Sequence, residues 1–149
     1  METSFEKVWK RVKASEPVDD AEKLQGFIRN ELRDAADYIW LARKTGALPL
    51  RRIFLSLAEE ERKHAKKLQA AAFMNFGETA IPSEQKKKDE ERMLGALRRR
   101  YTMEQSSAEA YLAGAENTSK ETLKKLYMEL SEEEHKHAEM LCLLLENMM

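Results

Sequence analysis

The sequence predicts an all-α protein: a four-helix bundle of two antiparallel hairpins joined by a crossover, with a short extra helix at the N-terminus. Two observations indicate this architecture. Apolar residues recur at spacings of three and four, the period of one helix face, through most of the 149 residues. The second half of the sequence also repeats the pattern of the first, as expected of a duplicated hairpin. We expect one domain, because a chain of this length buries about two-thirds of its unfolded surface around one core.

Residues 1–18 are expected to form the short N-terminal helix and a linker. Four apolar side chains there follow the i, i+3, i+4, i+7 spacing of one helix face: Phe5, Val8, Trp9 and Val12. The run Ser15–Asp20, which contains Pro17, should then interrupt the helix, and Asp19 or Asp20 is suited to cap the next one.

Residues 19–77 are expected to form the first hairpin. Its first helix should span about 20–45, because Gly46 is suited to end it. Its second helix should span about 49–75, because Pro49 is favoured in the first turn of a helix.

Residues 78–88 are expected to form the crossover, and residues 89–149 the second hairpin. The third helix should begin at Lys86 or later and reach about Glu116. A turn at residues 117–121 separates it from the fourth helix, which runs towards the C-terminus.

Each of the four inward helix faces carries a carboxylate where an apolar residue belongs, and two of them also carry a histidine three residues later. These residues are Glu31 in the first helix, Glu61 and His64 in the second, Glu104 in the third, and Glu134 and His137 in the fourth. Residues three apart share one helix face. Two Glu-x-x-His helices with two further glutamates predict a carboxylate-bridged pair of metal ions inside the bundle.

The internal repeat relates these residues by one constant offset. Four pairs are each separated by 73 positions: Glu31 and Glu104, Tyr38 and Tyr111, Glu61 and Glu134, and His64 and His137. The spacing alone is weak, because Glu132 also precedes His135 by three. His135, however, lies off the inward face and its counterpart is Arg62, so we expect it at the surface.

The alternative is a metal-free bundle whose core happens to contain glutamate and histidine. Four carboxylates brought together in an apolar interior would be costly without compensating charge, and some would take up protons. Divalent cations remove this conflict, so a metal centre is the preferred interpretation.

The residue types also predict ligand roles. Glu61 and Glu134 are expected to bridge the two ions, Glu31 and Glu104 to bind one ion each, and the histidines to complete one ion each. A site rich in oxygen with one imidazole per ion favours iron or manganese. Two iron ions are the first choice because their redox change makes a two-metal site useful; manganese is an alternative, and zinc could substitute in a crystal.

Four further residues are expected close to the ligands. Tyr38 and Tyr111 would donate hydrogen bonds to ligand carboxylates, with core filling as the alternative role. Asp34 and Ser107 follow Glu31 and Glu104 by one helical turn and are expected to play similar roles.

Composition argues against several other classes. The formal net charge of −1 gives no field suited to nucleic acid or an anionic membrane. The basic run Arg98–Arg100 lies near acidic residues and is expected to cover a solvated helix face. One cysteine allows no intramolecular disulfide, and no apolar run approaches the ~20 residues that cross a bilayer. A cytoplasmic protein is expected.

The ordered motifs resemble the rubrerythrin branch of the ferritin-like superfamily. The family pattern is Glu-x6-Tyr, Glu-x2-His, Glu-x2-Glu-x3-Tyr and Glu-x2-His. This chain supplies Glu31 with Tyr38, Glu61 with His64, Glu104 with Tyr111, and Glu134 with His137. The resemblance covers about Asp20 to the C-terminus. It implies a ferritin-like four-helix bundle, a di-iron centre and reactions with hydrogen peroxide or dioxygen.

Two departures from the family pattern bear on the chemistry. Ser107 stands where the family has a second glutamate, a carboxylate associated with movement of one iron during peroxide reduction. The ligand set is therefore closer to the generic ferritin-like pattern. The rubredoxin-like domain of typical rubrerythrins, with its four cysteines, is absent, so electrons are expected from a separate protein.

Three functions remain open at this point. The first is an oxidoreductase that reduces peroxide or activates dioxygen with external electrons; the second is a ferritin-like protein that binds and oxidises iron; the third is a metal-free interaction bundle. We expect a homodimer, formed through the apolar side of the N-terminal helix and the Met148–Met149 end. A large shell of subunits would instead favour iron storage.

Overall fold

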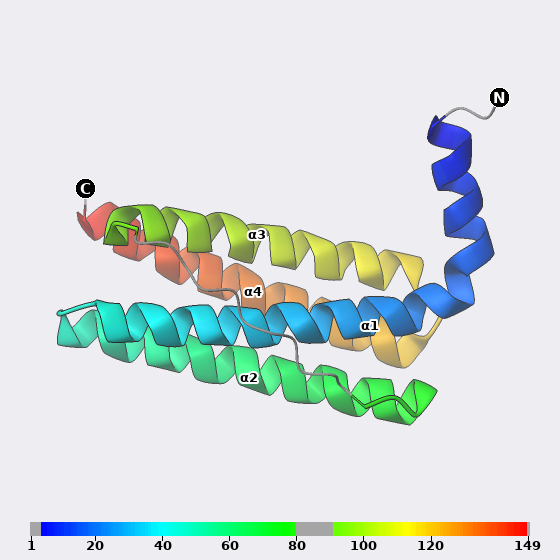
Figure 1. Ribbon diagram of the computed structural model, residues 1–149, viewed down its shortest axis with the longest axis horizontal. Helices are drawn as coiled ribbons and strands as arrows, with labels where there is room; N and C mark the ends of the chain where they lie inside the picture. Colours follow the sequence, from blue (N-terminus) through cyan, green and yellow to red (C-terminus); the bar gives the residue numbers. More distant parts are fainter. Residues whose placement is uncertain (1–3, 80–90, 149) are drawn as a thin grey trace.

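The computed structural model describes the backbone of residues 4–79 and 91–148, and the side chains of residues 20–79 and 91–148. This part of the chain is helical and contains no strand. The helices are α1 (Ser4–Lys44), α2 (Leu48–Phe76), α3 (Met93–Asn117) and α4 (Glu121–Met148). They form a four-helix bundle (Figure 1), as the sequence predicts.

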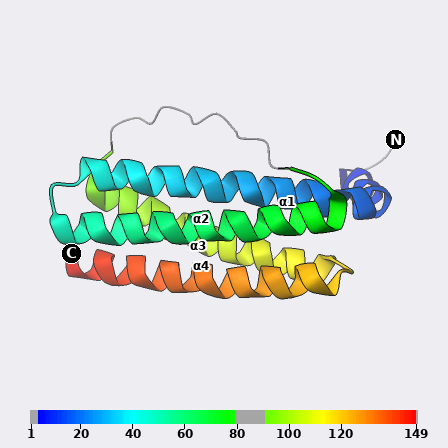
Figure 2. The same cartoon turned by 90° about the horizontal axis from the view of Figure 1, so that it is seen from below.

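The bundle consists of two antiparallel hairpins, α1 with α2 and α3 with α4, and the hairpins also meet through α2 and α4. Helices α2 and α3 run in the same direction (Figures 1 and 2), so the end of α2 and the start of α3 lie at opposite ends of the bundle. The connection between them therefore has to span its length, as a crossover does. Most of the crossover expected at residues 78–88 lies outside the described residues.

The N-terminal region differs from the expectation, because α1 is one helix of 41 residues rather than a short helix followed by a longer one. The run Ser15–Asp20 does not end it. Pro17 removes one backbone donor and bends a helix, but the flanking turns can continue helical on both sides of it. The side chains of the apolar stripe that begins at Phe5 lie outside the described residues.

The ends of α2 follow from local backbone chemistry. Pro49 lies in the first turn, where its missing N–H costs no helical hydrogen bond. Gly77 ends the helix with φ = 65°, a left-handed conformation that glycine adopts without a steric penalty. Its N–H donates to the carbonyl of Phe73, and the next N–H donates to Ala72. These bonds satisfy carbonyls that the helix end would otherwise leave free.

The core is divided along the bundle into two apolar clusters with a polar layer between them. One cluster, here the Leu41 cluster, includes Tyr38, Leu41, Phe54, Leu97 and Leu141. The other, here the Leu24 cluster, includes Leu24, Leu68, Tyr111, Tyr127 and Leu130. The polar layer comprises the buried residues Glu31, Glu61, His64, Glu104, Glu134 and His137. The apolar clusters thus hold four helices together around a buried group of ionisable side chains.

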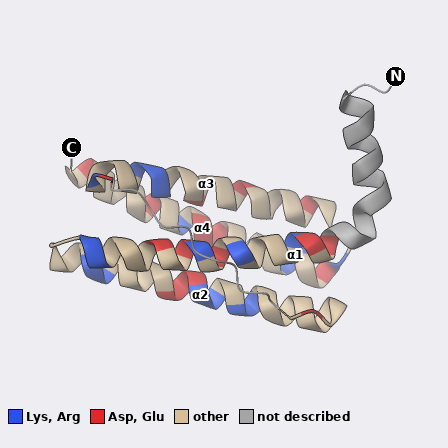
Figure 3. Ribbon diagram, in the orientation of Figure 1, with Lys and Arg blue, Asp and Glu red and all other residues tan. Residues whose placement is uncertain are grey.

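Residues of both charge signs are distributed along the bundle rather than separated into an acidic and a basic half (Figure 3). Within the described residues, none of the helices combines the length and the apolar character that crossing a membrane requires.

Candidate metal centre

All six side chains that the sequence predicts as ligands lie in the polar layer. They come from all four helices, and each is at most 3 % exposed. His135, which has the same spacing from a glutamate, is exposed, as the repeat indicates. Position on the inward face, rather than the Glu-x-x-His spacing alone, therefore distinguishes the clustered histidines.

The six residues form two overlapping groups, each of which could hold a metal ion. Position 1 is the group Glu31, Glu61, His64 and Glu134; position 2 is the group Glu61, Glu104, Glu134 and His137. Within each group, one ligand atom of every residue lies within 4.8 Å of the others. Glu61 and Glu134 belong to both groups, as the predicted bridging role requires.

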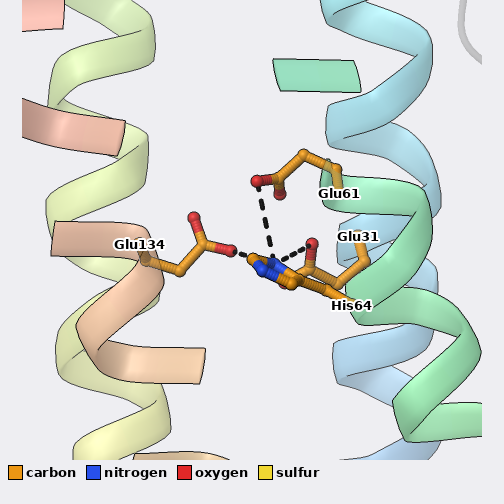
Figure 4. A group of neighbouring side chains, drawn as sticks. All are labelled: Glu31, Glu61, His64 and Glu134. Atoms are coloured by element: carbon orange, nitrogen blue, oxygen red, sulfur yellow. Dashed lines mark hydrogen bonds and ion pairs between the residues drawn. The ribbon is translucent and has the colours of Figure 1, made fainter. Parts of the chain in front are cut away.

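At position 1, three carboxylates converge on one imidazole (Figure 4). His64 Nδ1 lies 3.1 Å from Glu134 Oε1, 3.4 Å from Glu31 Oε2 and 3.8 Å from Glu61 Oε1. Donor atoms from both hairpins thus face one small volume.

Position 2 has the same arrangement with the hairpins exchanged. His137 Nδ1 lies 2.8 Å from Glu61 Oε1 and 3.6 Å from both Glu104 Oε2 and Glu134 Oε2. The two imidazole rings are nearly parallel, with an interplanar angle of 15° and centroids 5.7 Å apart. The pseudo-two-fold symmetry expected from the repeat is therefore present in the side chains.

Six oxygen and nitrogen atoms of the cluster lack hydrogen-bond partners among the described residues. Six of the eight buried side-chain atoms without one, among the described residues, belong to the cluster: Glu31 Oε2, Glu61 Oε1 and Oε2, Glu104 Oε2, Glu134 Oε2 and His137 Nδ1. His137 Nδ1 is close to Glu61 Oε1, but the contact does not have hydrogen-bond geometry. Unpaired buried polar atoms are costly and rare. This set of oxygen and nitrogen donors fits divalent cations, which would satisfy all of them.

Burial and proximity shift the proton affinities of the cluster. Burial raises the pKa of Glu31 to about 7, and burial with the neighbouring charge of Glu31 raises the pKa of Glu61 well above its usual value. Burial disfavours protonated His64 and His137, but the nearby carboxylates of the cluster outweigh it and raise their pKa values to about 10 and about 11. Burial disfavours ionised Glu134, yet both imidazoles lower its pKa to about 2. Without metal, the cluster therefore holds protons that cations would displace.

The outward nitrogen of each histidine contacts a carboxylate that the sequence analysis missed. His64 Nε2 pairs with Glu133 Oε2, and His137 Nε2 pairs with Glu60 Oε2. Such a carboxylate favours the proton on Nε2 and leaves Nδ1 free to bind metal. Glu60 and Glu133 are also 73 positions apart, so the repeat contained a signal for them.

The same two carboxylates line a cavity of about 440 Å³ between α2 and α4, together with both imidazoles and Lys63, Lys67 and Lys136. Because this cavity reaches the histidines, it offers a small molecule a route to the edge of the cluster.

The tyrosines bind carboxylates across the hairpins. Tyr38 donates its hydroxyl to Glu104 Oε1 at 2.5 Å, and Tyr111 donates to Glu31 Oε1 at 2.5 Å. Each tyrosine therefore contacts the non-shared glutamate of the other hairpin and leaves its Oε2 facing the cluster. The sequence predicts hydrogen bonds from the tyrosines to ligand carboxylates. It does not predict that each tyrosine binds a glutamate of the other hairpin.

Asp34 and Ser107 do not bind ligand carboxylates directly within the described residues. Asp34 accepts a hydrogen bond from Arg100 Nη1 at 3.0 Å, and Arg100 Nη2 donates to Glu104 Oε1 at 3.1 Å. The guanidinium of Arg100 thus connects Asp34 to Glu104 by two hydrogen bonds. No hydrogen bond joins Ser107 to the cluster in the described part of the chain.

Arg100 corrects the expectation that Arg98–Arg100 covers a solvated face. Arg98 is exposed, but Arg100 is only 1 % exposed and is among the largest fully buried side chains. It lies four residues before Glu104 on the inward face, and Asp34 and Asp37 of α1 compensate its charge. Charged runs are usually solvated, and periodicity alone does not reveal a partner on another helix.

Comparisons with known proteins support the fold. No protein-family model matches the chain, and no curated protein matches it significantly. A solved structure of a hypothetical protein from Pyrococcus furiosus is similar, with a TM-score of 0.71 and 27 % sequence identity. The similarity covers 85 % of this chain and 88 % of that one. The chain is therefore similar in fold to a protein whose name states no activity.

Proposed function

We propose that the protein is a di-iron carboxylate oxidoreductase of rubrerythrin type, which reduces hydrogen peroxide or activates dioxygen with electrons from an external donor. One observation carries the proposal. Four carboxylates and two imidazoles converge in the core, and six of their oxygen and nitrogen atoms lack hydrogen-bond partners. In a metal-free interaction bundle, protons and ion pairs would compensate part of the buried charge but would leave these six atoms without partners.

The proposed ligand roles follow from the two groups. Glu61 and Glu134 would bridge the ions because they belong to both positions. Glu31 and His64 would complete the ion at position 1, and Glu104 and His137 would complete the ion at position 2. Oxygen-rich coordination with one imidazole per ion favours iron, with manganese as the alternative. Bound iron supplies the one-electron redox change and the open coordination positions that peroxide or dioxygen requires.

The chain itself supplies positioning and a water-poor environment. The Leu41 and Leu24 clusters lie on either side of the polar layer and exclude water along the bundle axis. Tyr38 and Tyr111 hold the two non-shared glutamates, while Glu60 and Glu133 orient the imidazoles. The cavity between α2 and α4 is the proposed route for the oxidant.

Metal analysis after anaerobic loading with iron(II) tests the proposal. We expect two iron ions per chain, and loss of the pair in Glu61→Ala because both positions share this residue. His135→Ala is the matched control, since His135 is exposed on the same helix as His137. Wild-type protein without bound iron, or an unchanged iron content in Glu61→Ala, would falsify the assignment.

A second candidate is a ferritin-like iron-binding or ferroxidase protein, and Ser107 favours it by replacing the extra glutamate of the peroxide-reducing family. Mixing the fully reduced protein with peroxide or with dioxygen separates the candidates. Oxidation within seconds by peroxide supports the first, whereas oxidation by dioxygen alone supports the second. A mass corresponding to a homodimer is expected for the first, and a large shell of subunits would favour storage.

A further inference from the structure

The two metal positions have equivalent ligands but different surroundings. The offset of 73 relates Arg100 to Phe27, Asp34 to Ser107, and Asp37 to Ala110. Arg100 binds Glu104 and both aspartates. At the equivalent place, Phe27 packs against Tyr111, the residue that donates to Glu31. The repeat therefore provides an internal control for the effect of Arg100, Asp34 and Asp37 on a metal position.

At position 2, two donors occupy the same oxygen of Glu104. Oε1 accepts from Tyr38 at 2.5 Å and from Arg100 Nη2 at 3.1 Å. The guanidinium carbon lies 4.4 Å from the Tyr38 ring centroid, so Arg100 contacts both members of this hydrogen bond. Only Oε2 of Glu104 is left without a partner.

At position 1, the only hydrogen bond to the corresponding oxygen, among the described residues, comes from an uncharged tyrosine. Glu31 Oε1 accepts from Tyr111 at 2.5 Å. The ring of Phe27 lies 4.4 Å from that of Tyr111 and 5.1 Å from that of Tyr127. Among the described residues, no arginine or lysine donates to Glu31.

We infer that Arg100 makes the two metal positions unequal, so that position 1 binds its ion more tightly than position 2. The inference rests on the proposed two-metal centre. A guanidinium hydrogen bond draws electron density from a carboxylate and competes with a cation for its charge. Glu104 is therefore a weaker metal ligand than Glu31. Arg100 acts as a positioning residue, because it contacts Glu104 rather than the ion.

The two aspartates do not cancel this effect. Asp34 and Asp37 bind Arg100 on its Nη1 side, at 3.0 and 3.1 Å, whereas Nη2 reaches Glu104. Asp37 also binds Arg99, so its charge is divided between two arginines. The aspartates compensate the buried charge at a distance, while the hydrogen bond acts on Glu104 directly.

An anaerobic cobalt(II) titration, followed by calorimetry and visible absorption, tests the inference without relying on activity. Wild-type protein should bind two ions in two steps whose dissociation constants differ roughly tenfold or more, since partners of metal ligands commonly change affinity by this amount. Glu31→Ala should abolish the tight step, and Glu104→Ala should retain it.

A symmetrised variant gives the sharpest comparison. Asp34→Ser, Asp37→Ala and Arg100→Phe together place at position 2 the residues that the repeat has at position 1. The two binding steps should merge into one, with helical content checked by circular dichroism. If the triple variant loses its helical content, the Glu31→Ala and Glu104→Ala pair decides the question alone.

The outcomes separate this inference from the proposed function. The inference would be overturned if the wild type bound two ions with equal affinity, or if Glu31→Ala and Glu104→Ala weakened cobalt binding equally. Either result would leave the two-metal centre intact. No cobalt bound by the wild type would overturn the proposed centre itself, and the inference with it.

Discussion

The polar layer and the two apolar clusters beside it are built from the same four helix faces, but they depend on different partners. In the clusters, buried side chains such as Leu41 and Leu68 contact one another and need nothing from outside the chain. In the polar layer, both carboxylate oxygens of Glu61 are buried and lack hydrogen-bond partners among the described residues. The clusters therefore stabilise the bundle, whereas the polar layer carries a free-energy cost that bound cations would offset.

The largest expected effect is stabilisation of the polar layer by metal. At a free concentration about 1,000 times its dissociation constant, each bound cation should raise the free energy of unfolding by about 4 kcal/mol. Denaturant titrations with cobalt(II) or with a chelator measure this difference. Glu61→Ala should remove most of it, and equal stability of the wild type with and without metal would contradict the comparison.

A cavity in an apolar cluster should cost stability in both metal states. Leu68→Ala removes a fully buried side chain and is expected to lower the free energy of unfolding by about 2–5 kcal/mol. The metal content should remain that of the wild type. Phe73→Ala, at an exposed position on the same helix, is the control. A lower metal content in Leu68→Ala would show that the cluster and the polar layer are not independent.

An apolar substitution in the polar layer should stabilise the metal-free protein, whereas a cavity in an apolar cluster destabilises it. Glu61→Leu replaces a buried carboxylate whose oxygens lack hydrogen bonds, and is expected to raise the free energy of unfolding by about 1–3 kcal/mol, because Glu60 and Glu134 still pair with His137, while abolishing metal binding. Glu59→Leu, at an exposed position, should change stability by less than about 0.5 kcal/mol. A destabilised metal-free Glu61→Leu would refute the view that this layer opposes folding.

The pH dependence should also distinguish the metal-free from the metal-bound protein. Because burial raises the pKa of Glu31 from 4.5 to about 7, its contribution to metal-free stability is present below the unfolded pKa and is lost as the pH rises towards 7. Cations must displace this proton as well as those of His64 and His137, so metal affinity should fall with pH throughout this range and more steeply below about 7, by about tenfold per unit for each proton displaced. Calorimetry in buffers of different ionisation enthalpy measures the protons released.

The smallest expected effect concerns two buried tyrosines of the Leu24 cluster. Tyr111→Phe removes a hydrogen bond to Glu31 and should cost about 1–3 kcal/mol, because the acceptor is buried. Tyr127→Phe is matched in burial, but the Tyr127 hydroxyl lacks a partner, so this change should be neutral or stabilising. An equal decrease in the free energy of unfolding in the two variants would mean that the hydrogen bond from Tyr111 to Glu31 does not stabilise the protein.

The sequence predicted the parts of the site that depend on single helices. Helical periodicity predicts that Glu31 and Glu61 lie on inward faces. The repeat gives His137 a histidine counterpart and His135 none, which predicts that His137 is a ligand and that His135 is exposed. Both are properties of spacing along the chain. The same reasoning predicted the four-helix bundle.

Contacts between helices were harder to predict. Arg100 looked like part of a solvated run because its aspartate partners are on α1, and the outer carboxylates Glu60 and Glu133 meet histidines of the opposite hairpin. Periodicity assigns a residue to a face but does not reveal what lies across from it. The run around Pro17 predicts a break, but α1 continues through it, because a proline bends a helix without necessarily ending it.

The 73-residue repeat has a consequence for the origin of asymmetry in this bundle. One hairpin carries half of the cluster, so two identical hairpins could assemble a complete centre. Such an assembly would necessarily have the same residue at both equivalent places. A single chain containing both hairpins is free of that constraint, and here it has arginine at position 100 and phenylalanine at position 27. Joining the two copies is what allows the surroundings of the two positions to differ.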